Sequence, residues 1–238
     1  MKNRLNIVKV IVSISVFVLL VGFTYHRHKH KTVREVKINY LSSNEHFIDT
    51  VAVNKLLIQN KKHVKNMLID ELDLNLIETR LESHPMVENA EVYLNLNNNL
   101  SVDIAQPTPI GRVIGRNQFY IDSKGKEMPL SKNYSARVPV VINLNKALIP
   151  EAYKLLKFIK DDEFLNDRII QIKGYPDKQF SVKMRTHDFE IFVGNTENLN
   201  QKFFNFKAFY VKAEEDSLFN NYKTVKLQYG NQVVCEKY

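Results

Sequence analysis

Residues 74–106 read LNLIETRLESHPMVENAEVYLNLNNNLSVDIAQ, and this stretch decides the fold of the first half of the chain. Apolar residues recur at helical spacing at its start: Leu74, Ile77 and Leu81. Asp73, directly before them, is a residue type that caps helices, and Pro85 ends the helical pattern. Alternating strand patterns follow at 87–96 and 100–106, joined by asparagines, which tolerate the left-handed backbone of a tight turn. The stretch therefore predicts a helix followed by a β-hairpin.

Upstream of this stretch the sequence predicts one more strand and one more helix. The strand is Val33–Tyr40, in which apolar and polar residues alternate. The helix follows Asp49, with Ile48 and Val53 placed to form a hydrophobic staple. The predicted order is β-α-α-β-β, which suits two helices lying on one face of a small sheet. The expected core residues are Leu74, Ile77, Leu81, Val87, Val92, Val102 and Ile104.

Downstream the chain predicts a second unit rich in strands. The strand patterns lie at 113–114, 119–121, 138–144, 169–173, 180–184, 189–193, 224–229 and 232–238. Two helices interrupt them, one starting near Pro150 and one at 199–210. The second carries aromatic residues at helical spacing, which fit a core stripe better than a ligand box. The fold class is α+β.

Positive charge is concentrated at the N-terminus. Of the 34 Lys and Arg residues, seven lie in residues 1–34, which contain no acid, so the rest has 27 bases against 26 acids. A nucleic-acid-binding domain would carry its excess charge on the folded body. Here the charge brackets the apolar run at 5–25, a pattern that indicates a membrane boundary and argues against nucleic acid as a partner.

The run from Leu5 to Tyr25 contains a single charge, Lys9. As a helix it would be roughly 31 Å long, about the thickness of the hydrocarbon core, so it predicts a single membrane span. The alternative is a cleaved signal peptide, but the first alanine is Ala52, and no small-residue cleavage pattern follows the run. A basic collar at 26–32 comes next. Its histidines raise the alternative of a metal site, although no carboxylate or cysteine accompanies them: His26, His28 and His30.

The sequence carries no convincing catalytic or cofactor motif. Because Cys235 is the single cysteine, neither an intramolecular disulfide nor a multi-cysteine zinc site can form. Glycine-rich nucleotide-binding patterns are absent. One SxxK match, Ser123 to Lys126, lacks the partner motifs of penicillin-recognising enzymes and is interpreted as chance. We therefore expect no enzyme activity, no cofactor, no metal and no small-molecule substrate.

The order and spacing of these segments resemble the FtsQ/DivIB family of bitopic bacterial cell-division proteins. The matching elements are a leucine-to-proline helix end at 81–85, V-x-x-A-x-V at 87–92, L-x-V-x-I at 100–104 and FYIDSKGKEMPL at 119–130. The closing stretch TVKLQYGNQVVCEKY at 224–238 is similar to the last strands of the family. The resemblance implies a POTRA domain of β-α-α-β-β order, followed by a mostly antiparallel β domain with flanking helices. The expected layout is a cytoplasmic tail at 1–4, a transmembrane helix at 5–25, the collar at 26–32, the POTRA domain at 33–106 and the β domain at 107–238.

The resemblance also implies a function. It points to a non-enzymatic scaffold that links early and late division proteins at the septum. Such a protein lies in the inner membrane with its N-terminus in the cytoplasm and both domains in the periplasm, an orientation that the flanking charges alone do not decide. The implied partners are FtsB/FtsL-like bitopic division proteins and other divisome components. Two alternatives stay open: a POTRA-bearing envelope assembly or export factor, and a membrane-anchored enzyme.

The family recruits FtsB through its C-terminal strands, so the resemblance points to the terminal strand as a binding surface. A strand at a sheet edge accepts a partner strand by β-augmentation. The expected binding residues are Tyr229, Gln232, Val233, Val234, Cys235 and Glu236. Proline at Val234 is expected to abolish partner capture by removing a ladder donor. The alternative is an ordinary closing strand whose edge is protected by Glu236 and Lys237.

Overall fold

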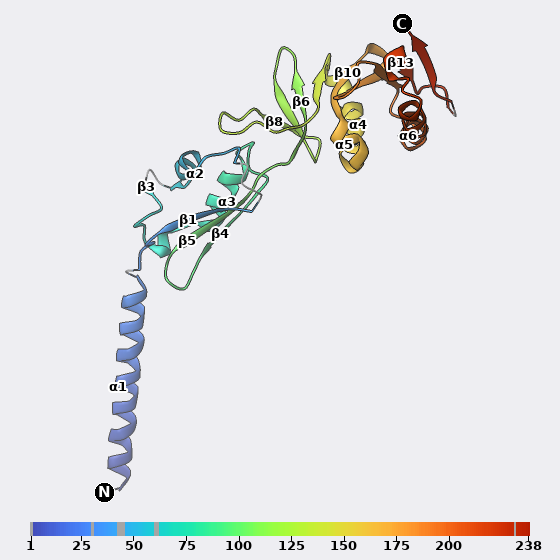
Figure 1. Cartoon of the computed structure of the whole chain (residues 1–238). Coiled ribbons are helices and arrows are strands. Elements are labelled where there is room, and N and C mark those ends of the chain that lie inside the picture. Colours follow the sequence, from blue (N-terminus) through green and yellow to red (C-terminus); the bar gives the residue numbers. More distant parts are fainter. Residues whose placement is uncertain (1, 30, 42–45, 60–61, 231) are drawn as a thin grey trace. The chain divides into compact units, whose positions relative to one another are not determined.

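The computed structural model describes residues 2–29, 31–41, 46–59, 62–230 and 232–238. Within these ranges, only the backbone is described for residues 2–8, 10, 24–29, 59 and 62. The chain divides into two compact units, Met1–Gln106 and Pro107–Tyr238 (Figure 1).

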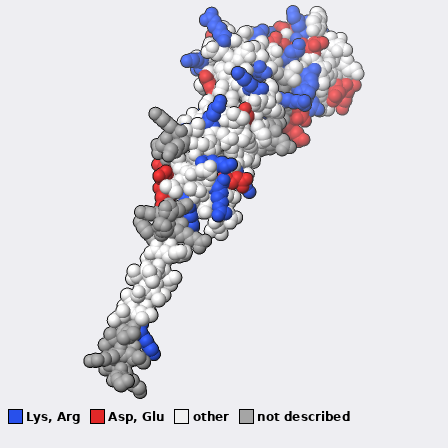
Figure 2. Space-filling model, turned by 90° about the vertical axis from the view of Figure 1, so that its left-hand side faces the viewer, with Lys and Arg blue, Asp and Glu red and all other residues white. Residues whose placement is uncertain are grey.

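When residues 1–34 are left out, the two units differ in the sign of their net charge. Residues 35–106 contain 6 bases and 11 acids, whereas residues 107–238 contain 21 bases and 15 acids. The near neutrality of residues 35–238 is therefore the sum of an acidic segment, 35–106, and a basic unit 2. Side chains of both signs are interspersed over the folded surface in the view of Figure 2.

Unit 1 has the predicted order of β-α-α-β-β. Its main elements are β1 (Val36–Tyr40), α2 (Thr50–Leu56), α3 (Leu74–Glu82), β4 (Asn89–Leu94) and β5 (Leu100–Ala105). β5 is the central strand, parallel to β1 and antiparallel to β4. The connection between the helices contains three short elements that were not predicted, because the segment is polar and has no clear period: β2 (Ile58–Gln59), β3 (Lys62–His63) and η1 (Ile69–Glu71).

The helices of unit 1 begin at the predicted aspartates. The Asp49 carboxylate accepts a hydrogen bond from the N–H of Ala52 at 2.7 Å. The Asp73 carboxylate accepts one from the N–H of Leu76 at 3.0 Å. Each side chain satisfies a main-chain donor that the first helical turn leaves free. In the β4–β5 turn Asn98 has a φ of 61°, the left-handed conformation that its residue type favours.

One hydrophobic cluster fills the space between the helices and the sheet of unit 1. Of the seven residues expected in this core, six are buried in the cluster, and Leu74 packs against it while partly exposed. Ile77 and Leu81 supply the buried side of α3. β1 begins three residues later than the predicted strand, because Val33 exchanges hydrogen bonds with Met67 and Asn66 instead of joining the sheet.

The predicted membrane segment at 5–25 lies within α1 (Lys2–Lys29). Its stretch 11–23 is exposed throughout and carries no charged residue (Figure 2). The side chains at 5–8, 10, 24 and 25 lie outside the described residues, as do those of the three collar histidines. Over the part of the chain that is described, no helix is both long and apolar enough to cross a membrane.

Unit 2 is built on a nine-stranded sheet. Its strands are β6 (Pro109–Ile114), β7 (Phe119–Asp122), β8 (Glu127–Pro129), β9 (Val140–Ile142), β10 (Ile169–Gly174), β11 (Phe180–Met184), β12 (Glu190–Gly194), β13 (Tyr222–Lys226) and β14 (Val234–Lys237). The spatial order is β14-β13-β12-β11-β10-β9-β6-β7-β8. Five neighbouring pairs are antiparallel and three are parallel, namely β6–β9, β9–β10 and β12–β13. The predicted antiparallel character therefore holds for most pairs but not for the centre of the sheet.

Helices cover one face of this sheet. They are η2 (Lys146–Leu148), α4 (Ile149–Asp161), α5 (Glu163–Arg168), α6 (Leu199–Glu215) and η4 (Phe219–Asn221), whereas η3 (Pro176–Lys178) lies in the connection between β10 and β11. The predicted aromatic stripe of α6 is confirmed as core, since it is buried against the sheet: Leu199, Phe203, Phe206 and Tyr210. Asp162, which the sequence places in an acidic cluster, caps α5 and pairs with Lys207 on α6 at 2.5 Å. This pair joins two of the covering helices.

Several strand bounds differ from the predicted ones. β9 stops at Ile142 because Asn143 has a φ of 55°, which breaks the extended backbone. β6 starts at Pro109, earlier than expected, and β8 was not predicted because it is only three residues long. β13 begins at Tyr222 and ends at Lys226 rather than at Tyr229.

Candidate partner-binding edge

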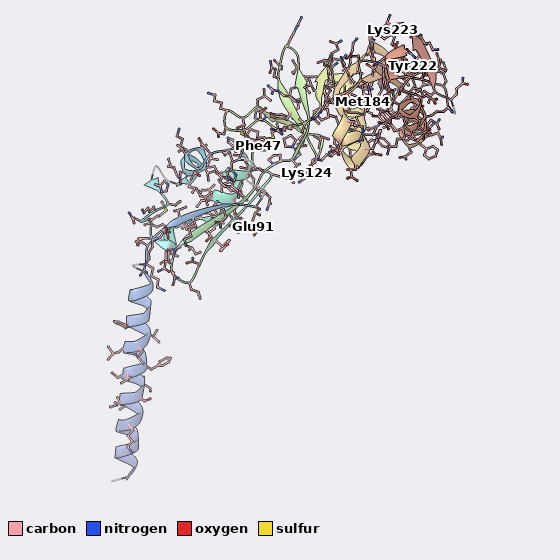
Figure 3. The ribbon with its side chains drawn as sticks, in the orientation of Figure 1. Phe47, Glu91, Lys124, Met184, Tyr222 and Lys223 are labelled. Carbon is pink, nitrogen blue, oxygen red and sulfur yellow. The ribbon has the colours of Figure 1, made fainter. Side chains whose placement is uncertain are left out.

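β14 is the edge strand at one end of the nine-stranded sheet (Figure 1). Among the described strands it pairs only with β13, and Thr224, Val225 and Lys226 lie opposite Glu236, Cys235 and Val234. Tyr222 and Lys223, labelled in Figure 3, mark the start of β13. The opposite edge of the sheet, β8, is three residues long and ends in Pro129, a residue that protects edges. β14 is thus the longer and less protected of the two edges.

The main chain of β14 has a defined outer side. The N–H of Tyr238 donates to the carbonyl of Asn221 at 3.4 Å, so the main chain of Tyr238 faces β13. Main-chain groups of an antiparallel strand point alternately to its two sides. Val234 and Glu236 therefore also face β13, whereas Cys235 and Lys237 face outward. Among the described residues, neither of these two outward N–H groups has a hydrogen-bond partner.

The direction of the Val234 N–H group corrects the expected effect of proline at this position. This N–H group points toward β13, so proline at this position would break the pairing inside the sheet and not the outer edge. The outward positions are Cys235 and Lys237, and Lys237 was not among the expected binding residues. The sequence does not indicate which N–H groups of β14 point outward, because this depends on the register of β14 against β13.

The side chains of β14 alternate between the two faces of the sheet. Cys235 lies opposite the buried Val225 and packs against the core with Val233, as expected for a small hydrophobic residue. Burial raises the pKa of the Cys235 thiol. On the other face the Lys226 Nζ lies 2.5 Å from the Glu236 carboxylate, and this hydrogen bond lowers the pKa of Glu236. A cross-strand ion pair therefore holds β14 against β13.

The remaining expected residues lie in the turn before β14. Tyr229 is 44 % exposed, and its carbonyl accepts the N–H of Gln232 at 3.2 Å. Gly230 has a φ of 54°, and its carbonyl accepts a hydrogen bond from the Asn205 side chain of α6 at 3.2 Å. The turn is therefore tied to the helix layer.

An apolar groove of about 340 Å³ adjoins the start of β13. Its walls include Phe209 and Ala213 of α6, Leu218 and Tyr222. Tyr222 lies opposite Lys237 of β14, so the groove and the open edge meet at this pair. The sequence did not single out these residues, because they come together only when α6 packs on the sheet.

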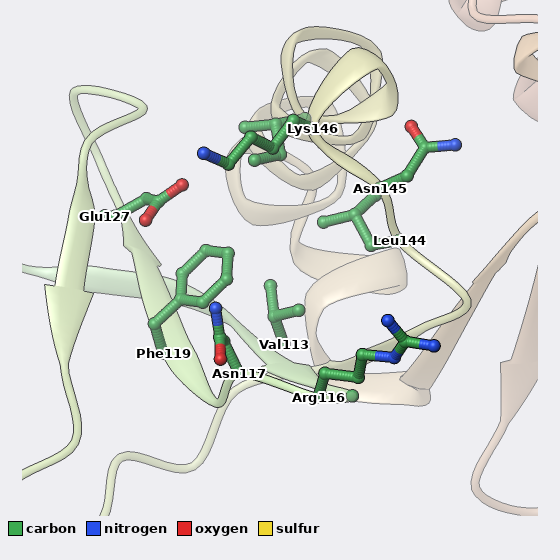
Figure 4. A pocket seen from close by; sticks show the side chains of 10 residues that line it. Val113, Arg116, Asn117, Phe119, Glu127, Leu144, Asn145 and Lys146 are labelled. Atoms are coloured by element: carbon green, nitrogen blue, oxygen red, sulfur yellow. The ribbon is translucent and has the colours of Figure 1, made fainter.

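A second cavity, of about 370 Å³, lies at the carboxyl ends of β6 and β9 (Figure 4). Its apolar side chains are Val113, Phe119, Leu144 and Ile149. Lys146 and Glu127 lie at one end and Arg116 lies at the other. Charges of both signs line the cavity, so its electrostatics do not select one class of ligand. Among the described residues, no three His, Cys, Asp or Glu side chains are grouped closely enough to hold a metal.

Comparison with models of protein families shows the family of this chain. The family model described as FtsQ/DivIB, C-terminal related, matches residues 108–236, which is more than half of the sequence. The chain belongs to this FtsQ/DivIB family. A POTRA-like domain model matches residues 32–105.

Among solved structures, the chain is similar to the major extracytoplasmic domain, trans isomer, of the cell division protein DivIB from Geobacillus stearothermophilus. The identity is 17 %, over 48 % of this chain and 97 % of that chain, with a TM-score of 0.34. No curated protein matches the chain.

FtsQ/DivIB membership indicates a role in cell division and interactions with other divisome proteins. The family consists of membrane-anchored proteins of the division septum and is typically non-enzymatic. Membership therefore favours the division protein over the export factor and the enzyme that the sequence left as alternatives.

Proposed function

We propose that this chain is a single-span, non-enzymatic scaffold of the division machinery that binds an FtsB/FtsL-like bitopic partner at the β14 edge. It joins early and late division proteins at the septum. The observation that carries the proposal is the pair of outward N–H groups of Cys235 and Lys237, which have no partner among the described residues. A partner strand would satisfy both donors.

In this proposal α1 anchors the chain in the inner membrane, with residues 1–4 in the cytoplasm and both units in the periplasm. The exposed and uncharged stretch 11–23 supports the anchor, as does membership of a membrane-anchored family. The groove beside Tyr222 extends the binding surface. A side chain located just after the partner's added strand would bind in this groove.

The sharpest test is a proline at Lys237, whose side chain is exposed and whose N–H faces outward. Lys237→Pro removes one outward donor without removing a hydrogen bond to β13. Lys237→Ala is the matched control, because it loses the same side chain and keeps the N–H. We expect the full-length Pro variant to lose co-purification with the FtsB-like protein of the host and the Ala variant to keep it.

Two further measurements complete the test. A fluorescent fusion of the wild-type chain is expected to gather at midcell. A folded Lys237→Pro protein that captures the partner as well as wild type would overturn the assignment of this edge. The outer edge of β1 in unit 1 would then be the next surface to examine.

A further inference from the structure

A third cavity, of about 220 Å³, lies at the opposite end of the central strands from that of Figure 4. Its apolar lining includes Ile110, Ile169 and Ile170, and of these Ile170 is 36 % exposed. Its charged side chains are all cationic: Arg137, Lys160 and Arg185. We call this group the cationic cleft.

The sheet topology brings together three residues that are distant in sequence. β10 and β11 are antiparallel, and the Arg185 N–H donates to the Arg168 carbonyl at 2.9 Å, which places Arg185 beside the start of β10. β9 runs parallel to β10, so Arg137, which precedes β9, lies at the same end. Lys160 comes from the last turn of α4.

All three cationic side chains of the cleft are exposed. None of the three forms an ion pair within the described part of the chain, and no carboxylate there lines the cleft. Asp162, two residues after Lys160 in the sequence, is paired with Lys207. Lys160 alone has an ordinary explanation, because a cation in the last helical turn interacts favourably with the helix dipole. Arg137 and Arg185 lie outside helices, so that explanation does not extend to them.

We infer that the cationic cleft docks an acidic segment of a protein partner, one that carries carboxylates beside aliphatic side chains. The three cations of the cleft would attract the carboxylates of such a segment, and the surplus of bases over acids in unit 2 adds to this attraction. The partly exposed Ile170 favours a peptide over a phosphate polymer, because the polymer would present no apolar group to it. The volume lies below the roughly 300–1,000 Å³ of small-molecule sites, so it suits one or two side chains.

This surface is separate from the proposed partner edge. The cleft lies at the ends of β6, β9, β10 and β11, and β12 and β13 separate these strands from β14. The inference therefore goes beyond the proposed function and does not depend on it.

The test measures binding of a short fluorescein-labelled peptide of glutamate and leucine to the full-length protein in detergent, by fluorescence anisotropy. The test variant carries Arg137→Glu, Lys160→Glu and Arg185→Glu. The control variant carries Lys126→Glu, Lys132→Glu and Lys157→Glu, three exposed lysines of the same unit, and has the same net charge. Thermal unfolding checks that both are folded, and a variant with glutamine at the three cleft positions replaces the first if it is not.

We expect the cleft variant to bind the peptide at least about tenfold more weakly than wild type, since three favourable charge contacts become repulsive. The control variant should stay within about twofold of wild type. A peptide with glutamine in place of glutamate should not bind. The Lys237→Pro variant should bind the acidic peptide normally, which separates this result from the test of the β14 edge.

Three results would overturn the inference. One is no detectable binding of the acidic peptide to wild type. Another is equal weakening in the cleft and control variants, which would show a general attraction to the basic unit. The third is a peptide that inorganic polyphosphate displaces, together with an equal loss of polyphosphate binding in the cleft and control variants. That result would show that the site attracts phosphate rather than an acidic peptide.

Discussion

The Glu78 carboxylate on α3 accepts a hydrogen bond from the main-chain N–H of Val92 on β4 at 2.7 Å. Glu82, one turn later, accepts the N–H of Ala90 at 3.4 Å. These two N–H groups lie on the side of β4 away from β5, so side chains of α3 occupy an edge that would otherwise be free. The β14 edge has no such cover among the described residues, and this contrast is why we place partner binding there.

Glu78→Ala is expected to lower the free energy of unfolding of unit 1 by about 1–2 kcal/mol. A hydrogen bond to a charged group contributes roughly 1.5–3 kcal/mol, and the better helix preference of alanine offsets a few tenths. Urea unfolding measures the change. Glu78→Gln, which keeps an acceptor, should lose less, and equal losses in the two variants would contradict the role of this hydrogen bond.

Leu81→Ala is expected to destabilise unit 1 by about 2–5 kcal/mol, because Leu81 is 0 % exposed and its removal leaves a cavity. Leu76 on the same helix is 42 % exposed and is the matched control. Leu76→Ala should change stability by no more than about 0.5 kcal/mol. Similar urea midpoints for the two variants would show that the Leu81 face is not core.

Acid is expected to loosen β14. The hydrogen bond from Lys226 lowers the pKa of Glu236 below its ordinary value of 4.5 in the folded chain. The pair therefore stabilises β14 above pH 4.5, and this contribution is lost as the pH falls through the lowered pKa. NMR of the β14 amides should show the loosening below about pH 4. Lys226→Met should remove the pH dependence; if it persists, another group is responsible.

The proposed anchor predicts that full-length protein keeps its N-terminal residues and stays in the membrane pellet after a carbonate wash. The uncharged stretch 11–23 is the physical reason, since apolar side chains remain in the hydrocarbon core. Mass spectrometry of the N-terminus and blotting of both fractions measure this. Introducing arginine at Val16 and Leu20 should release the protein. A wild-type protein that is recovered shortened and soluble would contradict the anchor.

Local signals in the sequence determined most of unit 1. Asp49 and Asp73 cap its helices because a carboxylate satisfies neighbouring N–H groups without help from distant residues. The spacing of Ile77 and Leu81 defines the buried face of α3 for the same reason, since helical periodicity is a property of consecutive residues. Family membership could also be recognised at this level, because it rests on the order and spacing of such segments.

Only the tertiary structure decided the surfaces. β9 inserts between β6 and β10, and this pairing brings Arg137 and Arg185 together although no local pattern connects them. The sequence predicted a terminal strand, but it could not show whether Val234 or Lys237 presents its N–H to a partner. That choice depends on the register with β13, because a shift of one residue exchanges the two sides of a strand.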